Sequence, residues 1–471
     1  MAERIIAQVS QLVLFVAAAR ILSPADFGVF ALVSSAAILL MRSAEVGWAP
    51  YIMSWEGDDT VPRQVVMVAL ISGVCIGALA FGVGLLLPLI GLPAVVSHLF
   101  LLFSVWIALA TTSSAQRGMM IWRDGLLGSS IAESLGEIAG MLVALVLLFH
   151  GYGVYSLAFG RLAYQTVHIV LSFAVTRRSP LWGMPRAELR VLGHYSWQIF
   201  TSRFITNMRL YIGTFLIGGF LGPASVGYYR AAQRLVGSVA EIIGSPSLVL
   251  SWSMFRQARD RFGARSPGFQ TQVNVYFKLL TAAGLPIFLW LGLMGGDLIT
   301  GLIGAKWLPA LPLVPVLAFA RALTMPNTVL EPILSLTGEI RRLPGFTLIF
   351  FIVAAVLTVA GGMIGLTAVA WSEVLTSALA MVAGGVLLQR HCGIAWDEVF
   401  AALRSLVLPL LAGSLALLFF RETLGTAQIG PLTRVLIATL PSLVIYALAL
   451  ALFDPDLRLF LRRRLRARAN A

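Results

Sequence analysis

The chain has 471 residues, of which 59% are hydrophobic and only 12% charged, and its formal net charge is +13. Soluble globular proteins contain about 25% charged residues, so this composition argues against a soluble protein and predicts an all-α, polytopic membrane protein. The two cysteines give neither a disulfide framework nor the spacing of a metal site. The positive charge favours arginine-rich loops that stay on the cytoplasmic side over a nucleic-acid surface.

Fourteen apolar stretches are long enough to cross a bilayer core of roughly 30 Å, which takes about 20 helical residues. They lie near residues 4–22, 26–47, 64–88, 94–113, 126–149, 153–176, 194–219, 224–252, 272–294, 310–330, 345–361, 365–388, 404–420 and 433–452. The first lacks a convincing cleavage site, which favours a retained span over a signal peptide. With the N-terminus inside, almost all loop arginines fall on one side, which predicts that both termini are cytoplasmic.

A short helix start occurs twice in the chain. The stretch ILSPADFGVFALV (21–33) matches FLGPASVGYYRAA (220–232) at Leu, Pro, Ala and Gly, with an offset of 199 residues and an aromatic at Phe30 and at Tyr229. In the first copy Ser23 is the expected N-cap, followed by proline at the first helical position. In the second copy glycine takes the cap position. A glycine one turn further on, Gly28 or Gly227, would let a neighbouring helix approach closely.

Two further matches follow in the same order. GLPAVVSHLFLLF (91–103) resembles WLPALPLVPVLAF (307–319) at an offset of 216, and GVYSLAFG (153–160) resembles GLTAVAWS (365–372) at an offset of 212. Together they predict a duplicated unit of six helices, with lobes at 1–190 and 191–395, followed by two helices and a basic cytoplasmic tail at 396–471. Because six is even, the repeats are expected to be parallel and to enclose a central cavity about which they rock.

The chain resembles a known family on three stretches: ARILSPADFGVFAL (19–32), LGPASVGYYRAAQRL (221–235) and GAKWLPALPLVPVLAF (304–319). They are similar to the polysaccharide transport family, the oligosaccharide flippases of the multidrug/oligosaccharidyl-lipid/polysaccharide exporter superfamily. The resemblance implies twelve core helices in two lobes. It also implies alternating-access export of polyprenyl-diphosphate-linked glycan units across the bacterial inner membrane, for exopolysaccharide or lipopolysaccharide synthesis. The implied partners are that lipid-linked oligosaccharide, membrane lipids, and the glycosyltransferases and polymerase of the same pathway, with no cofactor and no nucleic acid.

Charged residues inside apolar spans are costly, by about 2.5–3.5 kcal/mol at the membrane centre, and usually functional or paired. Arginines supply the positive charge and the donors that a diphosphate needs. The residues predicted to bind substrate are Arg203, Asn207, Arg209, Arg230, Arg234 and Arg321. Arg230, Arg234 and Glu241 share one helix face by their spacing. An intramembrane ion pair, in which Arg230 or Arg234 neutralises a carboxylate and contacts no substrate, is an equally weighted interpretation.

A second set of intramembrane residues is predicted either to carry a coupling proton or to form ion pairs. Its members are Glu133, Glu137, Arg161, Glu241 and Glu373. A carboxyl group in a low dielectric can hold a proton, but the favoured interpretation pairs Glu133 and Glu137 with Arg161. Lys278 is expected to reach the inner interface, and His168 to be a packing residue. No catalytic or metal-binding pattern and no phosphate-binding loop is present.

Three alternative functions stay open at this point. A drug or cation antiporter of the same superfamily would need a more acidic cavity. A membrane-embedded glycan polymerase or ligase would need a large periplasmic loop, and the outer connections here are short. A purely structural scaffold for glycosyltransferases is the third.

Overall fold

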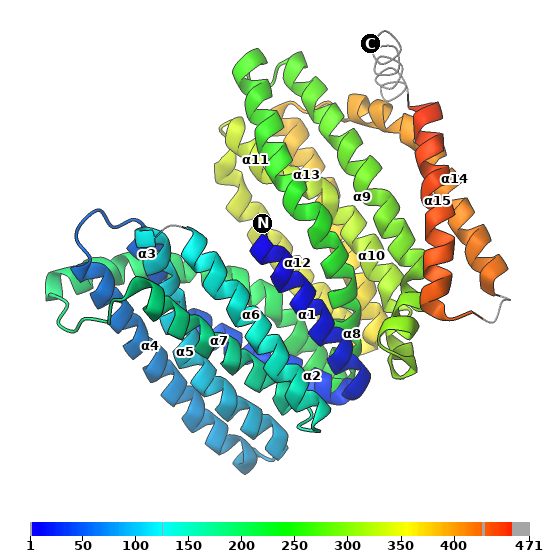
Figure 1. Ribbon diagram of the computed structural model, residues 1–471. Helices are drawn as coiled ribbons and strands as arrows, with labels where there is room; N and C mark the ends of the chain where they lie inside the picture. The colour runs from blue at the N-terminus through cyan, green and yellow to red at the C-terminus, as the bar shows by residue number, and fades with distance from the viewer. Residues whose placement is uncertain (1, 125, 426–428, 455–471) are drawn as a thin grey trace, which may run out of the picture. The chain divides into compact units, whose positions relative to one another are not determined.

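Helices make up all the regular structure in the part of the chain that the computed structural model describes (Figure 1). That part comprises residues 2–124, 126–425 and 429–454, with the side chains of 2–5, 124, 198, 199, 201–206, 209, 210 and 245 left aside. The predicted all-α class is therefore confirmed. The α-helices are α1 (Ala2–Ile21), α2 (Pro24–Ala44), α3 (Trp48–Met53), α4 (Thr60–Leu86), α5 (Ala94–Asp124), α6 (Leu126–Phe149), α7 (Tyr155–Thr176), α8 (Arg186–Phe262), α9 (Pro267–Leu302), α10 (Leu313–Thr324), α11 (Leu330–Leu336), α12 (Leu343–Ile364), α13 (Leu366–Cys392), α14 (Trp396–Gly425) and α15 (Pro431–Phe453). Short 3₁₀ helices are η1 (Leu87–Ile90), η2 (Ala305–Ala310), η3 (Met325–Val329) and η4 (Ile340–Arg342).

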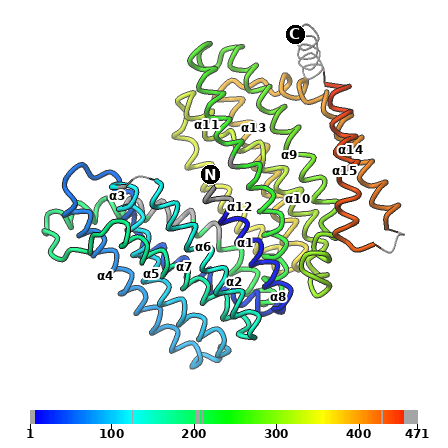
Figure 2. Tube along the Cα trace, viewed as in Figure 1, coloured from blue at the N-terminus to red at the C-terminus, as the bar shows by residue number. Residues whose placement is uncertain are grey.

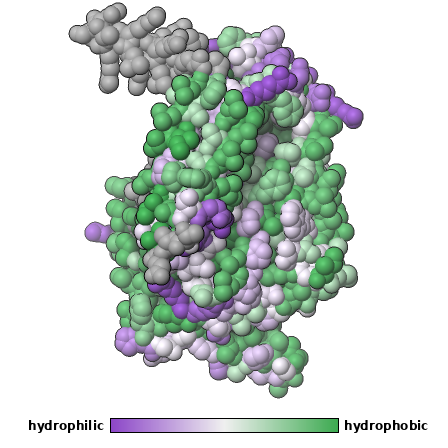
Figure 3. Space-filling view, turned by 90° about the vertical axis from the view of Figure 1, so that its right-hand side faces the viewer, coloured by the Kyte–Doolittle hydropathy of each residue, from purple (hydrophilic) through white to green (hydrophobic). Residues whose placement is uncertain are grey.

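Eleven helical segments of the described chain are long and apolar enough to cross a membrane. The predicted count of fourteen is not confirmed, for three physical reasons. The described apolar part of α1 is short, α7 is made less apolar by polar side chains such as Arg161 and His168, and α8 contains two of the predicted spans. The face seen in Figure 3 is mostly hydrophobic. Such a surface is expected where lipid replaces water as the solvent.

The first copy of the repeated turn starts a helix in the predicted way. Pro24 is the first residue of α2, and the Ser23 hydroxyl accepts a hydrogen bond from the Asp26 backbone N–H at 3.1 Å. The Ser23 hydroxyl also donates to the Asp26 carboxylate at 2.6 Å. The cap satisfies one of the N–H groups that a helix leaves unbonded at its N-terminus.

The second copy also starts a helical part, which follows a break within the long run α8. Gly222 has φ 78° and ψ 172°, a non-helical conformation within an otherwise continuous run, and Pro223 follows it. A positive φ costs glycine no steric strain. The predicted glycine cap therefore corresponds to a sharp break that divides α8 into two helical parts.

The two copies pack directly on each other. A Cβ atom on Gly28 would lie 1.8 Å from the Pro223 carbonyl oxygen, and a Cβ on Gly227 would lie 1.9 Å from the Pro24 carbonyl oxygen. The glycine of each copy thus packs against the proline carbonyl of the other. Such a reciprocal contact is the kind that two copies related by a twofold axis make.

The chain divides into two compact units, residues 1–227 and 228–471. In the first unit α4 packs along α5, α6 along α7, and α5 also contacts α2 and α7. The pairing of α4 with α5 is visible in Figure 2. The core between them is apolar and includes Leu99, Phe103 and Ile107. The predicted lobes at 1–190 and 191–395 and the appended segment 396–471 stay a prediction.

In the second unit α13 packs against α10 and α12, while α9 contacts α10, α14 and α15. The last two helices are tied to α9 by polar contacts as well as by packing. Trp290 donates to Thr439 at 2.7 Å, and the Tyr446 hydroxyl donates to the Ala282 carbonyl at 2.7 Å. These contacts fix α14 and α15 to the rest of the unit.

Candidate functional site

A buried tyrosine and a carboxylate mark the polar centre of the second unit. Tyr229, in α8 just after the break, is 6% exposed, and its hydroxyl donates a hydrogen bond to Oε1 of Glu373 in α13. Two guanidinium groups, Arg230 and Arg321, lie near enough to act electrostatically on the same hydroxyl. The helix that carries Arg321, α10, packs against α13. Three helices therefore bring one carboxylate and two arginines into one cluster, which we call the Tyr229 cluster.

The two arginines of this cluster are held differently. Arg230 donates from Nη1 to the Gln233 side-chain oxygen at 2.9 Å. Arg321 is partly buried, and its guanidinium makes no hydrogen bond or ion pair to any residue that the structure describes. An unpaired cation inside an apolar bundle is costly, and it is suited to an anion that supplies the missing charge and acceptors.

The other predicted substrate-binding residues stay a prediction. The side chains of Arg203 and Arg209 lie outside the described residues, and Asn207 belongs to the first unit. Arg234 is partly buried and Glu241 is exposed. Of the predicted set, the structure brings together Arg230 and Arg321, with Glu373 from the second set.

The carboxylates of the first unit have partners other than the predicted one. Glu133 forms an ion pair with Arg117 of α5, with Nε and Oε1 2.6 Å apart, and Glu137 accepts from the Gln11 side chain at 3.2 Å. The predicted pairing with Arg161 is wrong: within the described chain Arg161 is exposed and pairs with neither. The predicted span 94–113 ends before Arg117, but α5 continues to residue 124 and therefore carries this arginine alongside α6.

Two single residues are explained by their contacts. The Lys278 ammonium lies 2.6 Å from Oδ2 of Asp454, and the lysine and aspartate side chains are 15% and 5% exposed. Ser405 donates to the same oxygen at 2.9 Å, so Lys278 ties α9 to the end of α15. His168 is 2% exposed, with Nδ1 2.5 Å from the Ser113 hydroxyl, an environment that suits a packing residue.

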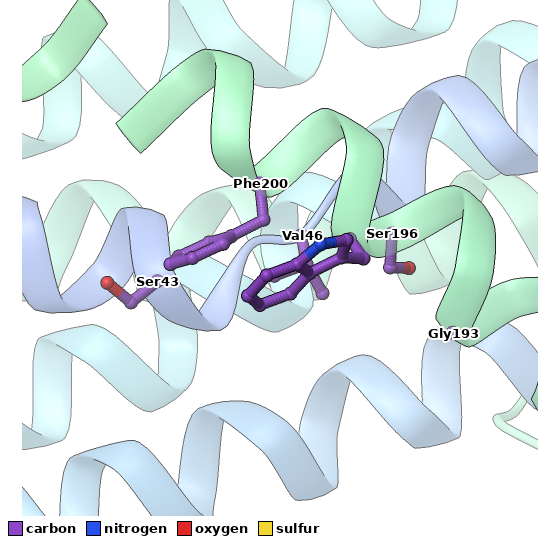
Figure 4. Close-up of a pocket in the computed structure, with 6 residues that line it drawn as sticks. Ser43, Val46, Gly193, Ser196 and Phe200 are labelled. Carbon is purple, nitrogen blue, oxygen red and sulfur yellow. The ribbon is translucent and has the colours of Figure 1, made fainter. Parts of the chain in front are cut away.

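An open hollow of about 270 Å³ lies in the first unit between the end of α2 and the first part of α8 (Figure 4). It is lined by Ser43, Val46, Gly193, Ser196, Trp197 and Phe200. In Figure 4 Phe200 projects from α8 toward Ser43. The described lining residues are apolar, small or hydroxyl-bearing, and none of them is charged. Among the described residues no group of three or more His, Cys, Asp or Glu could hold a metal ion.

Tyr229 and Gln233 were missed as functional residues, although the sequence contained a signal for the first. Tyr229 stands in the repeated turn where the first copy has Phe30. The sequence comparison noted only that both positions hold an aromatic residue. The extra hydroxyl in the second copy, next to Arg230, was the sign that this position makes a polar contact.

A family model described as "Polysaccharide biosynthesis protein" matches residues 17–312. The chain is 23% identical over 328 residues to the succinoglycan biosynthesis transport protein ExoT of Rhizobium meliloti (strain 1021), an alignment that covers 68% of this chain and 64% of ExoT. It is 27% identical over 130 residues to the teichuronic acid biosynthesis protein TuaB of Bacillus subtilis (strain 168), covering 27% of this chain and 26% of TuaB. The chain thus spans less than two thirds of the length of either relative.

Two solved structures share the fold. The lipid II flippase MurJ in an inward closed conformation superimposes with a TM-score of 0.74 and 13% identity, over 97% of this chain and 98% of MurJ. An inward-facing multidrug resistance transporter of the MATE family, from the MOP superfamily, gives a TM-score of 0.63 and 15% identity, over 82% of this chain and 94% of the transporter. The family match and these two structures agree with the resemblance to the polysaccharide transport family that the sequence stretches showed. The chain belongs to the family of polysaccharide biosynthesis proteins and has a fold of the MOP superfamily.

Proposed function

We propose that the protein is a flippase that moves a polyprenyl-diphosphate-linked oligosaccharide across the bacterial inner membrane by alternating access. The family match, the transport function in the name of ExoT and the fold shared with MurJ support a transporter of this kind. The cargo would serve exopolysaccharide or lipopolysaccharide synthesis, and both termini would face the cytoplasm. Glycosyltransferases and the polymerase of the same pathway would be its partners.

The observation that carries the proposal is the guanidinium of Arg321. It is partly buried, close to Arg230 and Tyr229, and has no anionic partner among the described residues. A diphosphate that leaves water must have its lost hydrogen bonds replaced, and arginine does this with a planar, bidentate donor set. A cationic drug would be repelled by the same groups, so the chemistry favours an anionic cargo over the antiporter alternative.

The short connections argue against the polymerase alternative. Between described helices the longest stretch outside an α-helix, residues 303–312, has ten residues and includes η2. An enzyme that joins glycan units would need a larger loop to carry catalytic groups. The described chain provides none.

The test is transport by purified protein in liposomes. A fluorescently labelled polyprenyl-diphosphate sugar is placed in both leaflets, and a membrane-impermeant quencher reports how quickly the protected label reaches the outer leaflet. Replacing Arg321 with alanine removes a charged hydrogen-bond donor, which typically contributes about 1.5–3 kcal/mol, so transport should slow by roughly 10- to 150-fold. The matched control is Arg390→Ala, an exposed arginine in the last turn of α13, which should transport at the wild-type rate.

Two results would refute this function. Wild-type protein that does not accelerate exchange of the labelled lipid is not a flippase for this cargo. A gene deletion that leaves lipid-linked repeat units on the outer face, not the cytoplasmic face, would indicate a polymerase instead.

A further inference from the structure

We propose that Tyr229 is a positioning residue that keeps the Glu373 carboxylate from pairing with the arginines of the Tyr229 cluster. This inference rests on the proposed function, because it assigns how the same site stays open to an anionic cargo. Tyr229 itself would not carry charge to the substrate. Its task would be to hold the cluster's own anion in place.

The geometry creates a competition that needs such a device. Glu373 is a partly buried carboxylate in a cluster with two guanidinium groups. A carboxylate and a guanidinium attract strongly in a medium of low dielectric, so Glu373 could satisfy Arg321 internally. An internally paired Arg321 would have to be separated from Glu373 before a diphosphate could bind.

The observed contacts show which partner Glu373 has instead. Its Oε1 accepts the hydrogen bond from the Tyr229 hydroxyl, while Arg321 makes no ion pair within the described chain. Tyr229 can hold this position firmly because its ring is only 6% exposed and cannot change rotamer without disturbing the packing. The next residue, Tyr228, has a different environment: its ring lies edge-on to Trp307, with the centroids 6.1 Å apart.

Removing the Tyr229 hydroxyl should therefore close the site. In Tyr229→Phe the ring still fills its space, but Glu373 loses its donor and is free to approach Arg321 or Arg230. The anion site would then be occupied by the protein's own carboxylate. Replacing Glu373 with glutamine in the same protein removes the competing charge and should open the site again.

The experiment measures binding of inorganic pyrophosphate to the purified, full-length protein in detergent by isothermal titration, beside the liposome transport assay. Tyr229→Phe should bind pyrophosphate about tenfold more weakly, which corresponds to about 1.4 kcal/mol. The double variant Tyr229→Phe/Glu373→Gln should bind at least as tightly as wild type. Tyr228→Phe is the matched control and should leave the affinity unchanged, since its hydroxyl makes no hydrogen bond to a described residue.

The rescue separates positioning from a merely structural role, because a packing defect in Tyr229→Phe would persist in the double variant. The proposal is overturned if Tyr229→Phe binds pyrophosphate as tightly as wild type, or if the double variant stays as weak as the single one. Should Tyr229→Phe not fold, Glu373→Gln alone still tests the proposal: it should bind pyrophosphate at least as tightly as wild type, and weaker binding would overturn the role of Glu373 as a competing anion. If Arg321→Ala binds pyrophosphate as tightly as wild type, the proposed binding site itself is refuted.

Discussion

The reciprocal contact between the two repeated turns predicts that alanine destabilises the protein at Gly28. The same substitution at a helical glycine without neighbours should not destabilise it. Gly28 lies in α2, and an alanine Cβ there would meet two backbone atoms of Pro223, the carbonyl oxygen at 1.8 Å and the carbonyl carbon at 2.6 Å. An ordinary contact begins at 3.4 Å, so the two segments would have to separate by about 1.6 Å, the difference between 3.4 and 1.8 Å. No side chain can relieve this clash by rotating, because the atoms that it meets belong to the backbone.

The expected magnitude follows from two opposing terms. Overpacking a close contact typically costs about 1–3 kcal/mol and sometimes more, whereas alanine in place of a helical glycine is favourable by about 1 kcal/mol. With backbone on both sides of the contact, the net effect of Gly28→Ala should be a loss of about 2 kcal/mol or more. Gly82 is the control: it is helical in α4 with no atom within 4 Å of its Cβ position, so Gly82→Ala should be neutral or stabilising by up to about 1 kcal/mol.

The assay is thermal unfolding of the purified protein in detergent, followed by the loss of its monodisperse peak in size-exclusion chromatography. Gly28→Ala and Gly227→Ala should each lower the midpoint, and Gly82→Ala should not. The double variant should cost less than the sum of the two, because one separation of the turns relieves both clashes and contacting residues do not act additively. Midpoints that are unchanged in both single variants, or losses that add in full, would refute the reciprocal contact.

Three further predictions concern ion pairs. Lys278→Met leaves Asp454 buried without its cation and should cost about 3–5 kcal/mol, whereas Lys278→Met/Asp454→Leu should recover most of this loss, as measured by thermal unfolding. Asp297→Asn removes the carboxylate that lies 3.1 Å from Arg434, and should lower stability by about 1.5–3 kcal/mol in the same measurement. The hydrogen bond from Arg342 holds the pKa of the partly buried Glu339 below its usual 4.5. Its stabilising contribution is therefore complete above the unfolded pKa and is lost as the pH falls through the folded pKa, so acidification below about pH 4.5 should lower the unfolding midpoint of wild type more than that of Glu339→Gln.

Each of these predictions has its own contradicting result. A double Lys278 and Asp454 variant as unstable as the single one would mean that packing, not charge pairing, holds the ends of α9 and α15 together. An Asp297→Asn protein with an unchanged midpoint would mean that water satisfies Arg434. Parallel acid curves for wild type and Glu339→Gln would remove the role of Arg342 in the depressed pKa of that carboxyl.

The helices were predictable from sequence because apolar length and local capping chemistry act over a few residues. Ser23, Pro24 and Asp26 form the expected helix start, and the break at Gly222 falls where the second copy of the turn predicted it. What the sequence could not supply was how far a helix continues past its apolar part. Polar residues such as Arg117 end an apolar stretch without ending the helix, so a residue expected in a loop lies instead on α5.

The same limit explains the mixed outcome for the site. A helical pattern tells which residues share a face, but the partner of a charged group is chosen by tertiary packing. From the sequence alone, either Arg161 or Arg117 could be the ion-pair partner of Glu133. The packing of α5 beside α6 brings Arg117 to it. Arg230, Arg321 and Glu373 were predicted separately. Their convergence depends on the packing of α8, α10 and α13, which no local pattern records.

The repeat itself offers the most informative comparison between the copies. At the offset of 199 residues Tyr229 corresponds to Phe30, and at the offset of 212 residues Glu373 corresponds to Arg161. Phe30 has an apolar role, with its ring centroid 5.8 Å from that of Phe103. At these two positions the second copy has a hydrogen-bonding tyrosine where the first has a phenylalanine, and a carboxylate where the first has a guanidinium. Under the predicted duplication, Tyr229 and Glu373 are two of the positions at which the copies differ, and their side chains meet in the Tyr229 cluster.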